Sequence, residues 1–172
     1  MNQNNIEKQI FTYSFLFRII FRFGNFFITV ILILYSVSLI TSFNGNLIFI
    51  LPLFVNLLIV YFLNIHYFTL YKIMPYKIEA DHEKLVCSDF FFSKKEMVIH
   101  YSTISSLSGG AFDNKFSGIM KVCDEKNDLY VGFYRKLNNS SKLVTIILSK
   151  VNIDIYNEVI GKIKSVQGEL NK

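Results

Sequence analysis

The chain has 172 residues, of which 52% are hydrophobic, and a net charge of +5. This length leaves room for one or two small domains, and the dispersed positive charge lacks the concentrated basic stripe of nucleic-acid-binding proteins. Its two cysteines, Cys87 and Cys123, have no metal-ligand partner at usable spacing. We expect two buried, reduced thiols in preference to a disulfide between them.

Residues 1–22 combine a polar start with a phenylalanine-rich continuation. Arg18 and Arg22 are spaced i and i+4, so both guanidinium groups share one face of a helix. Long basic side chains at that position reach lipid headgroups while neighbouring aromatic rings enter the apolar boundary. We therefore predict that residues 1–22 form a cytosolic or interfacial segment that leads into a membrane helix.

Residues 23–71 contain no Asp, Glu, Lys or Arg. A bilayer core needs about 20 apolar residues per helix, so this run accommodates two crossings and a turn. We predict transmembrane helices over residues 23–41 and 47–71, joined by an external turn over residues 42–46 that contains Asn44-Gly45. A cleaved signal peptide is the less favoured alternative, because the stretch before the apolar core is long and a second apolar segment follows at once.

The predicted hairpin carries polar side chains in both helices. Such groups seek hydrogen-bond partners on another helix when they are surrounded by hydrocarbon. The simpler interpretation is that the two helices bind each other, and the alternative is that some polar residues face a second subunit. These candidate helix-packing residues are Asn25, Thr29 and Ser36 in the first helix and Asn56 and Asn64 in the second.

Basic residues flank the hairpin on both sides, whereas its turn is uncharged. Arg18 and Arg22 precede the first helix, and Lys72 and Lys77 follow the second. Positive residues accumulate on the cytoplasmic side of membrane helices. We expect a multi-pass protein of the cell inner (plasma) membrane with both termini in the cytoplasm and residues 72–172 forming a cytosolic domain.

After Lys72 the sequence changes to short segments of strand character separated by polar or glycine-containing turns. From residue 152 the apolar period becomes helical, with Ile155, Val159, Ile163 and Val166 on one stripe. This order predicts an α+β membrane protein whose domain is a bent antiparallel sheet or barrel of about seven strands, capped by a C-terminal helix. The strands are expected over residues 76–80, 85–92, 97–101, 104–107, 118–123, 128–135 and 143–148.

Three features of this region resemble the bacterial pleckstrin-homology-like (PH-like) domains. Tyr76-Lys77-Ile78 lies just past the membrane segment, and a helix begins near Asn152. The run Lys94-Lys95-x-x-Val98-Ile99-x-Tyr101-x-x-Ile104 is similar to the family's third strand and its bend. The resemblance covers residues 72–168. It implies a seven-strand, helix-capped fold and a binding or assembly role, and it implies no catalytic residue, because the family shares none.

No motif in the sequence unites a nucleophile, a base and an oxyanion donor. The histidines are His66, His82 and His100, and the run Asp81-His82-Glu83 is expected to be a solvated turn, since three successive residues do not converge on one ion. The acidic turn over residues 124–128 fails the calcium-loop pattern. We therefore expect no catalytic residue, cofactor or metal. An enzyme would require a pocket that unites His82 or His100 with a carboxylate or a cysteine.

These observations favour a non-enzymatic, membrane-anchored scaffold that engages a protein partner or assembles with itself. The alternatives are an accessory subunit of a transporter or secretion system and an immunity-type membrane protein. Binding of anionic lipid headgroups is a secondary form of the hypothesis, and with no tryptophan or long apolar loop it is expected to be electrostatic and modest. The candidate membrane-surface residues are Arg18, Arg22, Lys72, Lys77, Lys94, Lys95, Lys115 and Arg135.

Overall fold

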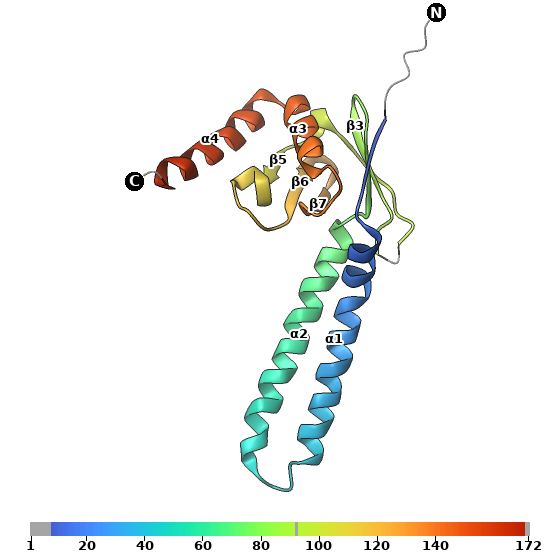
Figure 1. The fold of residues 1–172 in the computed structure, drawn as a ribbon, viewed down its shortest axis with the longest axis vertical. Coiled ribbons are helices and arrows are strands. Elements are labelled where there is room, and N and C mark those ends of the chain that lie inside the picture. Colours follow the sequence, from blue (N-terminus) through green and yellow to red (C-terminus); the bar gives the residue numbers. More distant parts are fainter. Residues whose placement is uncertain (1–7, 92, 171–172) are drawn as a thin grey trace, which may run out of the picture. The chain divides into compact units, whose positions relative to one another are not determined.

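The computed structural model describes residues 8–91 and 93–170, with side chains up to residue 165. The chain divides into two compact units. The helix unit is Phe15–Lys72, and the sheet unit joins the residues up to Ser14 to those from Ile73 onward (Figure 1). The expected α+β organisation, with two long apolar helices followed by antiparallel sheets and a C-terminal helix, is confirmed.

The helix unit is a hairpin of α1 (Phe15–Thr41) and α2 (Ile50–Ile73), with a short 3-10 helix, η1 (Leu47–Phe49), before α2. Gly45 reverses the chain at a φ of 78°, and the side chain of Asn46 accepts a hydrogen bond from the Ile48 amide at 3.1 Å. Pro52 lies in the first turn of α2, where its missing N–H costs no helical hydrogen bond. At 1.5 Å per residue, each helix is long enough to cross a hydrocarbon core about 30 Å thick.

The first sheet contains β1 (Gln9–Thr12), β2 (Lys77–Ala80), β3 (Lys84–Ser88) and β4 (Met97–His100), in that order and all antiparallel. The register aligns Phe11 with Ile78, Ile78 with Cys87 and Cys87 with Met97. All four side chains are buried. Because side chains alternate between the two faces of a strand, this row fixes which face of the sheet covers the core.

The second sheet has the order β5 (Ser106–Ser108), β6 (Met120–Asp124) and β7 (Leu129–Phe133). Leu107, Val122 and Val131 form its buried row. The β6–β7 turn is held by Asp124, whose carboxylate accepts hydrogen bonds from the amide and the side chain of Asn127 at 3.2 Å and 2.7 Å. This hairpin is the one predicted around the acidic turn.

Two helices close the sheet unit. In α3 (Ser140–Lys150), Leu143 and Ile147 are fully buried one turn apart. In α4 (Ile153–Leu170), Ile155 and Val159 are buried, as the predicted stripe requires, and Ile163 is half-buried. The side chain of Val166, the last residue of that stripe, lies outside the described part.

Two elements differ from the prediction. The strand expected over residues 143–148 is wrong, because these residues lie within α3. Their β-branched side chains favour a strand, but burial at i and i+4 selects the helix. The second difference is β1, which comes from the segment expected to be only interfacial. The strand count of seven in the described residues is reached with β1 in place of the strand over residues 143–148. The strand expected to reach Phe92 ends at Ser88, and Phe92 itself is not described.

Candidate functional site

The polar residues of the helix unit meet in a seam between α1 and α2. Asn25 Nδ2 donates to Asn64 Oδ1 at 3.1 Å, and Asn64 Nδ2 donates to Thr29 Oγ1 at 3.1 Å. Further along, Asn56 Nδ2 donates to Ser36 Oγ at 2.7 Å and to the Leu32 carbonyl at 2.9 Å. The structure therefore brings all five candidate packing residues into interhelical hydrogen bonds.

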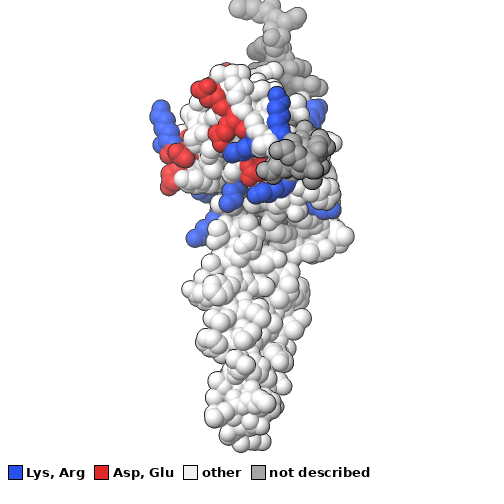
Figure 2. Space-filling view, turned by 90° about the vertical axis from the view of Figure 1, so that its left-hand side faces the viewer, with Lys and Arg blue, Asp and Glu red and all other residues white. Residues whose placement is uncertain are grey.

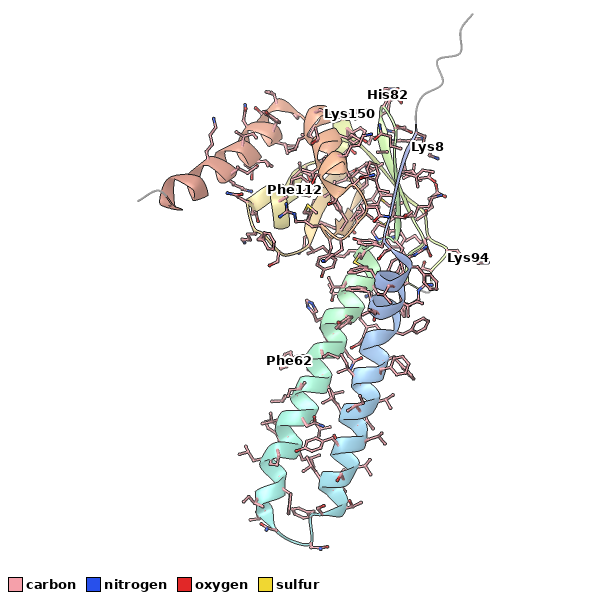
Figure 3. The ribbon with its side chains drawn as sticks, in the orientation of Figure 1. Lys8, Phe62, His82, Lys94, Phe112 and Lys150 are labelled. Atoms are coloured by element: carbon pink, nitrogen blue, oxygen red, sulfur yellow. The ribbon has the colours of Figure 1, made fainter. Side chains whose placement is uncertain are left out.

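The outer surface of the same two helices is apolar. Isoleucine, leucine, valine and phenylalanine side chains are exposed along both, and Phe62, which is 63% exposed, points away from the neighbouring helix (Figure 3). On the face in view, Figure 2 shows the charged side chains on the sheet unit and an uncharged surface over residues 23–71. Asn56, by contrast, is only 4% exposed. Burying polar groups while exposing apolar ones is the reverse of the pattern in a water-soluble helical pair.

The candidate basic residues do not share one environment. Lys77 lies on the outer face of β2, where it and Lys8 form ion pairs with Glu79. These two lysines hold the pKa of the Glu79 carboxyl below its usual value, with the hydrogen bond from Lys77 the larger cause.

Lys94 and Lys95 are exposed on the β3–β4 loop. In the helix unit, Arg18 and Arg22 are half-buried on α1 and Lys72 is exposed on α2.

Lys115 and Arg135 lie on two loops of the second sheet. The Lys115 ammonium is 3.9 Å from an Asp113 carboxylate oxygen, a long and solvent-exposed ion pair. The Arg135 guanidinium lies 5.5 Å from the centroid of the Phe116 ring. That distance is within the range of a cation–π interaction. Arg135 and the loop carrying Lys115 are thus joined through an aromatic residue that the sequence did not single out.

A polar pocket of about 370 Å³ opens beside the β2–β3 turn. It unites both histidines of this region with a carboxylate, and His82 and Lys150 from this site are labelled in Figure 3. The Lys150 ammonium donates to the Asp81 carbonyl at 2.8 Å and lies 5.1 Å from the centroid of the Tyr101 ring. The lining residues are His82, Glu83, His100, Tyr101, Ser102 and Lys150.

The lining of this pocket meets the requirement stated for an enzymatic alternative, because His82 and His100 share it with the Glu83 carboxylate. Beside the pocket, the Glu83 amide donates to the Asp81 carboxylate at 2.8 Å, and the His100 carbonyl accepts a hydrogen bond from the Thr103 hydroxyl at 3.0 Å. Cys87 is fully buried, and burial raises the pKa of its thiol to about 12, which removes it as a nucleophile. The pocket offers a set of hydrogen-bond donors and one carboxylate.

Comparison of the chain with protein-family models, with curated proteins and with solved structures finds no match. Function must therefore be argued from the geometry of this chain alone.

Sequence reasoning missed two of these features. No local pattern singled out Phe116, because its loop neighbours Lys115 and Ser117 are polar. Its contact with Arg135 forms only when β6 and β7 pair. Tyr101 and Lys150 are distant in sequence and meet only because α3 covers the end of β4. In each case the missing signal was the pairing of distant segments.

Proposed function

We propose that the chain is a membrane-anchored, non-enzymatic binding or scaffold module of a bacterial inner membrane. The observation that carries this proposal is the inverted surface of the helix unit, with Asn25, Ser36 and Asn56 buried and large apolar side chains exposed. A soluble protein rarely exposes a contiguous apolar surface beyond a few hundred Å². In a bilayer the same surface is solvated by lipid chains, and the polar seam gives the side-chain N–H groups of Asn25 and Asn56 acceptors within the hairpin.

The proposed topology has both termini in the cytoplasm, because the basic residues lie on both sides of the hairpin and not in its turn. A reporter that is active only outside the cytoplasm tests this. Fused after Lys172, it should give no signal, whereas the same reporter inserted after Gly45 should be active. Activity at Lys172 with silence at Gly45 would overturn the orientation.

For the sheet unit we propose a PH-like fold with a binding role. Two antiparallel sheets of four and three strands followed by a helix support this, although α3 intervenes before the last helix and β1 precedes the hairpin. The outer face of the first sheet offers a surface for a protein partner or a second copy. One register row across that face runs Ile10, Glu79, Val86 and Val98, and Ile10 and Val98 are exposed.

The binding role is tested with the full chain in mild detergent. Proteins captured with the wild-type chain are compared with those captured by the Val98→Asp variant and by a control, Tyr130→Asp, which places the same charge on an exposed residue of the second sheet. A partner on the proposed face is lost with V98D and retained with Y130D. Equal capture by both variants would exclude the first sheet's outer face.

A further inference from the structure

Both chain connections leave the sheet unit at the same end. β1 pairs with β2 so that Thr12, just before the exit at Ser14, lies opposite Lys77, just after the re-entry at Ile73. The connector that follows β7 lies at this end too, because Tyr13 forms a bridge with Leu137 and the Asn138 amide donates to the Thr12 carbonyl at 3.0 Å. Within the sheet unit, the two exits therefore lie at the same end as residues 134–138.

Phe116 belongs to this end of the unit. Its loop leads into β6, and the connector leads out of β7; Met120 at the start of β6 pairs with Phe133 at the end of β7. The side chains of Ile119 and Ile73 both lie against the backbone of Gly132. A Cβ added at Gly132 would be 2.5 Å from the Cδ1 atom of Ile119 and 3.4 Å from that of Ile73. The Phe116 ring is 89% exposed. It is thus an unburied aromatic side chain close to the point where the chain enters the helix unit.

The loop that carries Phe116 is fixed at its base. Gly109 adopts a φ of 77°, and a Cβ there would lie 2.1 Å from the Ile119 carbonyl oxygen, so only glycine fits. The Asp113 carboxylate accepts a hydrogen bond from the Gly109 amide at 2.9 Å, and the Lys115 amide donates to the Gly110 carbonyl at 2.8 Å. Because these contacts already hold the base of the loop, presenting the ring to a surface requires less loss of conformational freedom than it would from an unconstrained loop.

Charge differs between the two ends of the β6–β7 hairpin. The turn end carries Asp124, Glu125 and Asp128 against one lysine, Lys126. The end with Phe116 carries Lys115, Arg135 and Lys136, and the Asp113 carboxylate there is shared between Lys115 and Lys162 at 3.9 Å each. A basic end with an exposed ring suits an anionic, partly apolar surface, and the acidic end does not.

We infer that Phe116, with Arg135 and Lys115 beside it, is a membrane-interface contact: the ring enters the headgroup boundary and the two cations bind lipid phosphates. The inference rests on the proposed insertion of the hairpin, which brings a bilayer to the two exits. The chemistry is that of aromatic side chains at interfaces, which favour the headgroup level, and of basic residues attracted to anionic lipids. Its consequence is that the sheet unit is held against the membrane in one orientation.

Fluorescence quenching tests this directly, because the chain contains no tryptophan. Three full-length single-tryptophan proteins, Phe116→Trp, Tyr130→Trp and Leu34→Trp, are placed in nanodiscs of phosphatidylcholine and phosphatidylglycerol with or without bromine on the acyl chains. Tyr130 is an exposed aromatic residue near the acidic turn, and Leu34 is exposed on α1. We expect brominated lipid to remove most of the emission of F116W and L34W and to leave that of Y130W unchanged.

The outcomes separate the two proposals. Quenching of L34W without quenching of F116W overturns the interface contact and leaves membrane insertion standing, whereas failure of both overturns insertion itself. A blue-shifted but unquenched F116W indicates contact with protein and also overturns the inference. Adding Arg135→Gln to F116W should reduce quenching in anionic nanodiscs, and unchanged quenching would remove Arg135 from the contact.

Discussion

Replacing Phe11 with alanine tests whether the segment before the hairpin is a structural strand of the sheet unit. The Phe11 side chain is 2% exposed and stands in the buried row opposite Ile78. Truncating a buried phenylalanine to alanine costs about 3–5 kcal/mol. A domain of this size has a free energy of unfolding on the order of 5–15 kcal/mol, so the change removes a large part of it.

The neighbouring residue supplies a matched control. Ile10 lies in the same strand but is 57% exposed, and an exposed substitution changes the free energy of unfolding by about 0.5 kcal/mol or less. For domains of 60–100 residues, each kcal/mol shifts the melting temperature by roughly 4–8 °C, which predicts a loss of at least about 12 °C for Phe11→Ala and little for Ile10→Ala.

The assay is a protease pulse applied to the full chain in mild detergent after equilibration at increasing temperatures, because the apolar helices themselves are not expected to melt in the micelle. Cleavage within residues 73–165 reports unfolding of the sheet unit. Equal melting temperatures for the two variants would refute the assignment of β1 to this unit.

Two further predictions concern the helix seam and the thiols. Asn56→Leu removes the hydrogen bonds to Ser36 and Leu32, each worth about 0.6–2 kcal/mol in a membrane, so the hairpin should open at a lower SDS concentration than wild type. Leu57→Ala, on the exposed side of α2, should open like wild type, and identical behaviour of both variants would mean that the seam does not hold the helices together. In the folded chain at pH 8, a maleimide should label half-exposed Cys123 well before buried Cys87, and both at equal rates in SDS. Because burial raises the pKa of Cys87 from 9.0 to about 12, the neutral thiol is favoured in the folded state and stability should fall as pH rises above 9; faster labelling of Cys87 than of Cys123 would contradict this burial.

The parts of the fold that could be predicted are those that depend on the pattern of residues close together in sequence. The uncharged run over residues 23–71 indicates two long helices by length alone, and the alternation of Met97, Ile99 and Tyr101 marks a strand. The spacing of Asn25, Thr29 and Ser36 also places them on one helical face before any partner is known. These features need only residues that are close in sequence.

The parts that were missed depend on distant partners. β1 is four residues long, and its partner β2 begins at Lys77, beyond the whole hairpin. In residues 143–148, the β-branched residues Val144, Thr145, Ile146 and Ile147 indicate a strand, and only the burial of Leu143 and Ile147 against the rest of the unit decides for a helix. Tertiary packing thus overrides a local preference that is worth less than one buried side chain.

The insertion of the hairpin between β1 and β2 also bears on biogenesis. The antiparallel pair can close only when the residues before Phe15 and those after Lys72 are on the same side of a membrane. If one helix crossed and the other did not, the bilayer would separate β1 from β2, β3 and β4. Phe11 would then have no sheet to pack into. A folded sheet unit therefore requires that the two helices cross the membrane together or not at all.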